Sequence, residues 1–430
     1  MLRPRAFPSA APTGKAAREI PLDRWVDHPG YGVTPQRVVN IYRLAEAGSL
    51  RQQCDLFDDL AENDGHLRNL FEQRAQAVAG KPWIVQGDGD QGETQTASRI
   101  IGEALRALPM VEVLEHQLGF NFYGYAATEI DWGVRNIEGR DWFVPVWLAN
   151  VPARRFSVRP GNDEIRLLTA EEPTTGAELA PGKWLITRRS GVRVARAGLM
   201  RTAAWYACFK RFATRDWVIY AEKYGLPLTL AKYGDPASMG GSTDDEGRLV
   251  AQEIVENIGN DGGAVVPKSI DIEIKEAGRT GDSSGVHGGL IAHCNAEMSK
   301  LVNGGTLSND NAGSGGASYA LGEVHASTRW DNVLSDGERV QESFRLQLFA
   351  SFMRFNGLTG PSPLLKIQVV RDLAPRERAE VADIFVNKLG GQASLAQLAQ
   401  ELGMKAPLDA ADTARGAPKV EPKAPEKVPA

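Results

Sequence analysis

The chain has 430 residues, of which 42% are hydrophobic and 24% are charged, so it is long enough for two or more domains or for one elongated subunit of several subdomains. Its formal net charge of -5 argues against a protein that coats nucleic acid with a general basic surface, although it is compatible with one that lets DNA slide past without gripping it. The three cysteines are far apart and form no C-x-x-C pair, which suits a reducing compartment. The sequence contains no uninterrupted apolar window of about 18 residues, so no membrane span is predicted.

The N-terminal part of the chain predicts an irregular arm followed by helices. Residues 1–33 contain Pro, Gly and Arg but no apolar signal core, and we expect a flexible arm. Thr34–Pro35 is typical of a helix start, because Thr can cap and Pro is tolerated at the first helical position. Further helices are predicted to begin at Ser49 and at Asp64, and a strand is predicted from Trp83.

The next part changes from helical to β-rich. Helices are predicted over residues 97–108 and 109–118. Residues 120–187 then contain β-branched and aromatic runs separated by turn residues, which indicates several short strands. Their Trp and Tyr side chains could stack on a ligand, but packing in a core or between subunits is the favoured role.

A long uninterrupted helix is predicted over residues 198–224. It spans about 40 Å at 1.5 Å per residue. Apolar residues lie around most of its circumference, so we expect it to be packed on several sides. Arg211 and Arg215 share one face, which is either a solvated or ion-paired face or a contact with nucleic acid or a neighbouring subunit.

A series of short elements follows that helix. A short strand pattern, LTLAKY, lies within residues 225–241. A helix is predicted over Ser242–Ile258, capped by Ser242 or Thr243. Residues 262–277 predict a strand pair with a turn near Pro267, and residues 287–302 predict an amphipathic helix.

The segment Asn303–Glu323 is a long loop of Gly, Ser and Asn between two helical patterns. A loop of that length inside a compact fold is usually functional or disordered. Helical periodicity returns over residues 321–358, and a strand and two further helices are expected up to residue 404. Residues 405–430 are rich in Ala, Pro, Lys and Glu and predict a disordered tail.

Tests for chemistry identify no enzyme signature and no cofactor site. The chain lacks a Walker A string, and the loop glycines Gly313, Gly315 and Gly316 have neither the Rossmann spacing nor a preceding strand. The six histidines form no metal-binding spacing, and the adjacent His293 and Cys294 point about 100° apart on a helix, which argues against a catalytic dyad.

Several passages resemble the portal proteins of Mu-like tailed bacteriophages and prophages. The helical run TPQRVVNIYRLAEAGSLRQQCDLFDDL, the strand-rich FYGYAATEIDW and the stretch RDWVIYAEKYGLPLTLAKY carry the likeness. The most specific passage is NGGTLSNDNAGSGGASYALGEVHASTRWDNVLSDGERV. The resemblance extends over roughly residues 30–375, so it leaves the N-terminal arm and the C-terminal tail without a role.

The resemblance implies an α+β fold, namely an elongated subunit with a helical and β-rich wing, a two-helix stem, a small clip and a C-terminal crown. Carried onto this sequence, it divides the chain as follows: wing 34–197; stem 198–260 with the clip at 225–241; a strand pair and helix returning to the wing, 261–302; channel loop 303–320; long helix 321–358; crown 359–404.

The resemblance also implies a function: subunits form a ring, usually of twelve copies, at one capsid vertex. Double-stranded DNA in the channel of the ring would make weak, non-specific contact with it. The implied protein partners are the terminase large subunit, head–tail connector proteins, and the major capsid and scaffold proteins. The expected location is the virion, with the host cytoplasm during assembly. A conduit must not hold DNA tightly, which fits the mild charge, and a ring requires head-to-tail interfaces.

Three sets of candidate residues follow from this division of the chain. The channel-loop candidates are Thr306, Ser308, Asn309, Asp310, Asn311 and Ser314; the clip candidates are Leu228, Lys232, Tyr233 and Asp235; and the stem basic-face candidates are Arg201, Arg211 and Arg215.

Two alternatives remain beside the portal interpretation. One is a head–tail connector or adaptor ring, although connectors are usually shorter and lack a helix–clip–helix arrangement. The other is a nucleotide-binding enzyme that uses the loop Gly304–Gly316, although this loop has no lysine to serve as the cation of a phosphate cradle.

Overall fold

The structure is a computed structural model that describes residues 32–87, 92–224, 229–233, 263–267, 283–305, 319–368 and 375–384, together with four helical positions at 248, 249, 252 and 253. The chain divides into two compact units, residues 1–369 and 370–430. Helices and sheets mix in the first unit, so the predicted α+β class is confirmed. In the second unit, the described element is α13 (Pro375–Asp383), which begins at a proline, a residue tolerated in the first turn of a helix.

Three helices open the described chain: α1 (Pro35–Glu46), α2 (Arg51–Asn63) and α3 (Gly65–Ala79). Thr34 caps α1 by accepting from the Arg37 amide at 3.3 Å, and Asp64 caps α3, as predicted. The prediction that Ser49 opens α2 was wrong. The Ser49 amide instead donates to Leu44 O at 3.0 Å and completes the end of α1.

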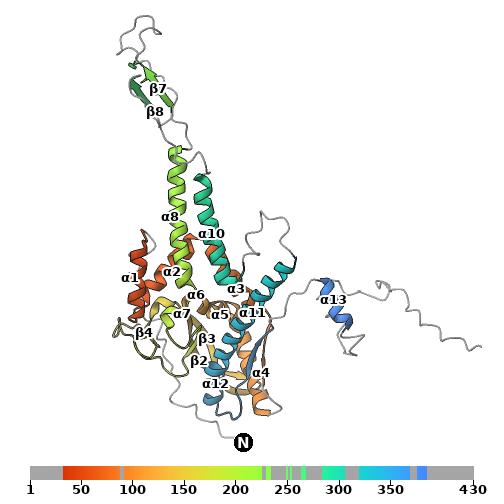
Figure 1. Cartoon of the computed structure of the whole chain (residues 1–430). Coiled ribbons are helices and arrows are strands. Elements are labelled where there is room, and N and C mark those ends of the chain that lie inside the picture. Colours follow the sequence, from red (N-terminus) through yellow and green to blue (C-terminus); the bar gives the residue numbers. More distant parts are fainter. Residues whose placement is uncertain are drawn as a thin grey trace, which may run out of the picture. The chain divides into compact units, whose positions relative to one another are not determined.

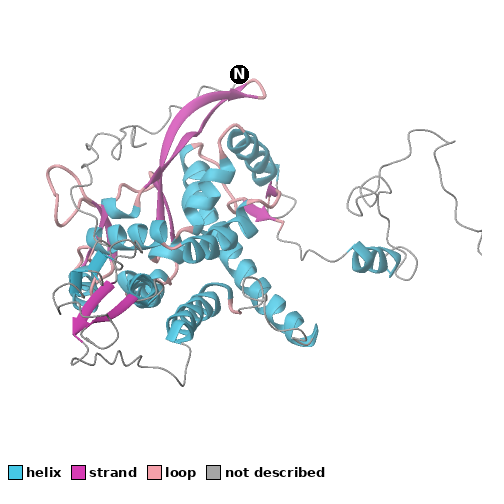
Figure 2. Cartoon of the chain, turned by 90° about the horizontal axis from the view of Figure 1, so that it is seen from above, coloured by secondary structure: helices cyan, strands magenta, loops and turns pink. Residues whose placement is uncertain are grey.

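The β-rich region forms around a three-stranded antiparallel sheet of order β3–β2–β6. Seen from above, β2 and β3 form a long curved hairpin (Figure 2). The elements of this region are, in order, β1 (Trp83–Gln86), α4 (Gly92–Arg106), α5 (Met110–Leu118), α6 (Phe120–Tyr123), β2 (Tyr125–Ile137), β3 (Arg140–Val151), the 3-10 turn η1 (Ala153–Arg155), β4 (Phe156–Arg159), β5 (Glu164–Leu167), β6 (Trp184–Arg188) and α7 (Val194–Ala197).

The long helix α8 (Met200–Tyr224) is followed by strand β7 (Thr229–Tyr233), strand β8 (Gly263–Pro267) and helix α10 (Ser283–Asn303). The described partner of β8 is β7, in parallel register, rather than a strand from the pair predicted within residues 262–277. Helix α10 lies beside α8 (Figure 1). The predicted second stem helix, Ser242–Ile258, lies outside the described residues except for its four helical positions.

A continuous helical rod then crosses the sheet: α11 (Tyr319–Ser343), the π-helical segment η2 (Phe344–Phe349) and α12 (Ala350–Phe355). Two amide side chains bind it to both edge strands. Gln347 bonds the backbone of Ile186 in β6 at 2.8 and 2.7 Å, and Asn356 bonds that of Phe143 in β3 at 2.9 and 2.8 Å. Each amide offers a donor and an acceptor, as a neighbouring strand would, so the backbone groups of Ile186 and Phe143 are satisfied without another strand.

Strand β9 (Leu364–Ile367) pairs with β1 in antiparallel register. This strand, which the portal resemblance implies belongs to the crown, lies within the first unit, where it pairs with β1. At the other end, Val33 is only 3% exposed and packs in a core with α1, so the expected flexible arm does not include it.

Three apolar cores hold the first unit together. The largest lies between the sheet, α4, α5 and the η2–α12 part of the rod. A second joins α1, α2 and α3 to the N-terminal part of α8 and the C-terminal part of α10. A third packs against β4 and β5. The second core is therefore the base from which the α8–α10 pair extends.

Candidate functional site

The α8–α10 pair is antiparallel (Figure 1). At one end the ring centroids of Tyr220 in α8 and His287 in α10 are 6.3 Å apart. At the other end, Met298 and Val302 of α10 share the second core with Met200 of α8. The two helices thus pack along most of their length, and α8 with 25 residues is about 37 Å long.

The first turn of α3 anchors both helices. Asp64 caps α3 and also accepts from Lys210 Nζ of α8 at 2.8 Å. His66 Nε2 lies 3.1 Å from Asn295 O and 3.0 Å from Ser299 Oγ of α10. Because one short turn contacts both members of the pair, the pair has a defined base on the body of the subunit.

The three arginines proposed as a stem basic face have different surroundings. Arg201 forms an ion pair with Glu46, lies 4.1 Å from the ring centroid of Tyr42 and donates to Gln53 Oε1 at 3.0 Å. Partial burial lowers the pKa of its guanidinium, although Glu46 opposes that shift. Arg201 therefore serves to join α8 to α1 and α2 and does not present a free charge. Arg211 is half-buried, and Arg215 is exposed and paired with the adjacent Asp216 at 2.8 Å.

The distal part of α8 exposes apolar side chains in several directions. Trp217, Val218 and Ile219 are 39%, 53% and 40% exposed, and consecutive helical residues point about 100° apart. Helix α10 covers only one of these directions. A helix that is apolar around most of its circumference is normally buried on several sides. In a single copy, the apolar surface of this part of α8 is therefore incompletely covered.

One buried arginine of α3 joins the residue just before the predicted channel loop to the interior of α11. Arg74 donates through Nη1 to Val302 O at the end of α10, and through Nε and Nη2 to the Asp336 carboxylate of α11 at 2.7 and 3.0 Å. Gly304 has φ +79°, and a Cβ there would lie 2.8 Å from the Thr328 Cγ2. The glycine is therefore required for both its backbone conformation and its close approach to α11.

Most of the remaining candidate residues lie outside the part of the chain that the structure describes. This is true of the channel-loop candidates Thr306, Ser308, Asn309, Asp310, Asn311 and Ser314, and of the clip candidates Leu228 and Asp235. Lys232 and Tyr233 lie in β7, which pairs with β8. The structure thus brings two clip candidates into one strand and defines the anchored base of the loop.

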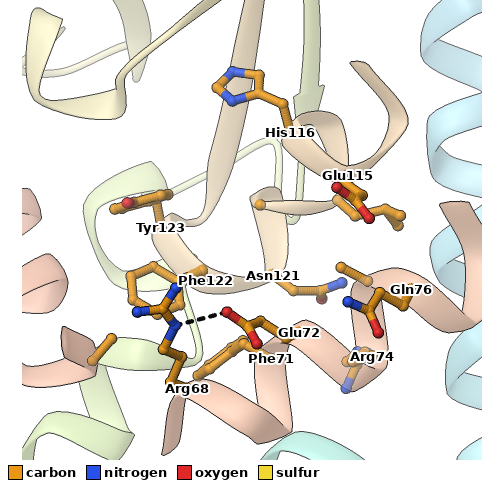
Figure 3. A pocket seen from close by; sticks show the side chains of 14 residues that line it. Arg68, Phe71, Glu72, Arg74, Gln76, Glu115, His116, Asn121, Phe122 and Tyr123 are labelled. Carbon is orange, nitrogen blue, oxygen red and sulfur yellow. Dashed lines mark hydrogen bonds and ion pairs between the residues drawn. The ribbon is translucent and has the colours of Figure 1, made fainter. Parts of the chain in front are cut away.

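A cavity of about 400 Å³ lies between α3 and the α5–α6 segment (Figure 3). Phe71 and Phe122 form an aromatic wall with ring centroids 4.7 Å apart, and an Arg68–Glu72 ion pair lies beside them. His116 also lines the cavity, but its Nε2 is 3.0 Å from Ala127 O, and burial lowers the pKa of its ring. This lining contains no nucleophile paired with a base, so its geometry gives no support to an enzymatic role.

Within the described stretches, no cluster of three or more His, Cys, Asp or Glu side chains is arranged to hold a metal ion. Among the helices described, none is long and apolar enough to cross a membrane. The three cysteines are all buried.

Sequence reasoning missed the residues that organise this region. Arg74 and Asp336 are 262 positions apart, and Gln347 and Ile186 are 161 positions apart. Arg74, Asp336 and Gln347 each look like an ordinary polar residue on a helix, and no local spacing signals their partners. Only the tertiary arrangement could reveal them.

Comparison with known proteins matches residues 54–404 to the family described as "Portal protein of Mu bacteriophage". The chain is 28% identical over 348 residues to "Mu-like prophage FluMu protein gp29" of Haemophilus influenzae, covering 78% of this chain and 64% of that protein. It is 30% identical over 345 residues to "Portal protein" of Escherichia phage Mu, covering 78% and 63%. The chain thus spans slightly less than two thirds of the length of these relatives.

A solved structure with a similar fold is a chain of "Neck of empty GTA particle computed with C6 symmetry". The TM-score is 0.50 at 16% sequence identity, and the match covers 86% of this chain and 94% of that chain. At this identity the likeness concerns the fold alone.

Proposed function

The chain belongs to the Mu bacteriophage portal-protein family, and from this premise we propose that it forms a ring at one capsid vertex through which double-stranded DNA is packaged, retained and ejected. The observation that carries the proposal is the α8–α10 pair. It is a rigid helical pair, fixed at its base by Asp64 and His66, whose distal apolar side chains are left uncovered in one copy. Neighbouring copies around a ring would cover them.

The division of the subunit is revised in this proposal. Residues 242–258, expected to pair with α8 in the stem, lie mostly outside the described residues, and among the described helices it is α10 that packs along α8. We assign α8 and α10 to the stem and the intervening segment, which contains β7 and β8, to the clip. The wing is then the remainder of the first unit, from α1 to β6 with the rod and β9.

The charges of the described stem fit a channel wall that does not hold DNA tightly. Arg201, Lys210 and Arg215 are each paired with a carboxylate, and the chain as a whole has a net charge of -5. Counterion release would therefore add little affinity for phosphates. The clip would contact the terminase large subunit and then head–tail connector proteins, and the wing would face the major capsid and scaffold proteins. The ring would be assembled in the host cytoplasm and carried in the virion.

The first test is the oligomeric state. We expect the purified chain to assemble into a closed ring, with twelve copies as the expected number, because the uncovered stem surface requires a partner. Native mass spectrometry together with end-on negative-stain images would measure the copy number and show a central channel. A protein that stays monomeric under assembly conditions would refute the proposal.

A second test concerns the segment after Gly304. Shortening residues 306–316 is expected to leave the ring intact but to impair DNA packaging or retention, because the packed positions Arg74, Val302 and Gly304 remain. Ring mass and the amount of nuclease-protected DNA would be measured on the same preparations. Normal packaging by the shortened chain would count against a channel role for this segment.

A further inference from the structure

Asn121 of α6 has a side-chain donor that no residue in the described part of the chain uses. The residue is 2% exposed, and its Oδ1 accepts from Arg189. A guanidinium has only donors, so the amide oxygen faces Arg189 and Nδ2 faces away from it. This Nδ2 is buried and has no hydrogen-bond partner among the described residues. Figure 3 shows the side chain directed toward the part of the cavity that Gln76 lines. The cavity therefore offers a buried donor that lacks an acceptor.

The cavity wall beside this donor is aromatic and incompletely covered. Phe71, Phe122 and Tyr123 all line the cavity and are half-buried. The ring centroid of Phe122 lies 4.7 Å from that of Phe71 and 4.6 Å from that of Tyr123. A water molecule could satisfy the Asn121 amide, but it would leave this wall uncovered. The cavity is therefore better matched by an apolar group that has a carbonyl oxygen beside it.

The rim of the cavity adds a negative charge. Arg68 and Glu72 neutralise each other in an ion pair of 2.7 Å. Glu115 also lines the cavity, and it is exposed and forms no ion pair with another described residue. Complementary charge on an occupant would thus be positive. An occupant that fits the wall, the buried donor and the rim has an aromatic side chain, a carbonyl acceptor and an adjacent cation.

One segment of the chain outside the described residues combines these groups. In that part of the sequence, the aromatic residues are Phe7, Trp25, Tyr31 and Phe385. Among these four, only Trp25 has a basic residue directly beside it, namely Arg24. Aromatic side chains bury about 150–250 Å² each, and the peptide groups on either side of an indole supply carbonyl acceptors. The sequence therefore favours the Arg24–Trp25 pair.

The length of chain between this pair and the described residues fits docking in the same subunit. Trp25 is seven positions before Gly32, where the described chain begins. An extended chain spans about 3.3–3.6 Å per residue, so this segment can reach about 25 Å. Val33 packs in the second core, and Phe71 and Phe122 of the cavity wall pack against that same core. The described chain thus begins in the core that borders the cavity.

We propose that the Arg24–Trp25 segment docks in the cavity between α3 and the α5–α6 segment of its own copy. The Trp25 indole covers the aromatic wall, and a backbone carbonyl beside it accepts from Asn121 Nδ2. The Arg24 guanidinium pairs with Glu115 at the rim. This contact goes beyond the proposed ring and does not depend on it, because it is made within one copy. It gives a role to part of the N-terminal segment, which the resemblance to portal proteins leaves unassigned.

A photoreactive aromatic side chain at position 25 tests the contact. In the full chain, Trp25→p-benzoylphenylalanine is expected to cross-link on illumination to cavity-lining residues of α3 or of the α5–α6 segment. Phe7→p-benzoylphenylalanine is the matched control and is expected to give no such product. Peptide mass spectrometry would identify the joined residues. Cross-links from position 25 to other surfaces only, or equal cavity products from both positions, would overturn the proposal.

Mixing ¹⁵N-labelled and unlabelled chains before assembly distinguishes a chain's own segment from that of another copy. Docking within one copy gives cross-linked peptides in which both parts have the same label. Products with mixed labels would overturn docking in the own cavity and would assign the site to the segment of a second copy. A monomeric protein that still cross-links within one copy would refute the proposed ring and support this contact.

Filling the cavity gives an independent readout. Ala75 lines the cavity. In the photoreactive chain, Ala75→Phe is expected to lower the cross-link yield by roughly tenfold while helical circular dichroism is unchanged, because two rings cannot occupy the same space. Asn69→Phe adds the same side chain at an exposed position of α3 that does not line the cavity, and its yield is expected to stay normal. Equal yields from the two variants would contradict the proposed contact.

Charge exchange tests the rim. In the photoreactive chain, Arg24→Glu and Glu115→Arg are each expected to lower the yield by about two- to fivefold, because each brings like charges together at an exposed site. The double exchange restores opposite charges and is expected to recover the yield. A double variant that cross-links no better than the single variants would overturn the pairing of Arg24 with Glu115.

Discussion

Replacing Arg74 with methionine is expected to lower the free energy of unfolding by about 3–5 kcal/mol, the range measured when one partner of a buried ion pair is removed. The Arg74 side chain is 7% exposed and that of Asp336 is 3% exposed, and two hydrogen bonds of 2.7 and 3.0 Å join them. Without the guanidinium, the buried Asp336 carboxylate loses its hydrogen-bonded cation and Val302 O loses its donor. Urea unfolding of variants at one protein concentration would measure the loss.

The same helix supplies a matched control. Arg68 pairs with Glu72 through a bond of the same length, 2.7 Å, but the two side chains are 60% and 51% exposed. Water screens this pair, so Arg68→Met is expected to cost less than about 1 kcal/mol. Combining Arg74→Met with Asp336→Leu removes both charges and is expected to recover much of the loss. Equal, small losses for Arg74→Met and Arg68→Met would show that burial does not determine the effect.

Local signals in the sequence predicted most element boundaries in this chain. Thr34 and Asp64 cap helices through their own side chains, and Pro109 precedes α5, so these starts depend on residues only two or three positions away. The alternation of β-branched and aromatic residues likewise located the β-rich region. Ser49 shows the limit of such signals, because the end of α1 competes for its amide.

Pairing between distant elements was harder to predict. The resemblance to portal proteins implied residues 242–258 as the partner of α8 in the stem, and that call stays a prediction because most of these residues lie outside the described part of the chain. The packing of α10 on α8 depends on tertiary contacts: Tyr220 meets His287, and Asp64 and His66 tie both helices to α3. Likewise, no local sequence signal shows that Arg201 is paired with Glu46, 155 positions earlier.

The candidate site was predicted in part. The loop after Asn303 stood out because of its length and composition, yet the residue that fixes its base, Arg74, lies on an unremarkable helix 228 positions before Val302. The apolar residues around most of α8 predicted packing on several sides. In one copy, the apolar side chains in the distal part of α8 are exposed.

Replacing Asp58 with asparagine is expected to stabilise the protein at pH 8 but not at pH 4. Burial raises the pKa of Asp58 from the ordinary value of 3.8 to about 6, while the hydrogen bond from the Tyr123 hydroxyl works in the opposite direction. Nearby Asp55 and Glu62 also raise this pKa, and Arg154 lowers it. The folded state therefore favours the protonated acid.

The sign of the pH dependence follows from linkage. Below about pH 4, Asp58 is protonated in both folded and unfolded states, so its stabilising contribution is fully present. This contribution is lost as the pH rises through about 6, because the unfolded state ionises more easily. Two pKa units correspond to about 3 kcal/mol, and partial exposure of Asp58 reduces the expected difference to about 1–2 kcal/mol.

Unfolding curves at pH 4 and pH 8 would test this expectation. Asp58→Asn keeps an oxygen that can accept from Tyr123, so the gain of about 1–2 kcal/mol should appear only at the higher pH. The exposed Glu62 provides a control on the same helix, and Glu62→Gln is expected to change stability by only a few tenths of a kcal/mol. A gain for Asp58→Asn that is the same at both pH values would mean that packing, and not ionisation, limits stability at this position.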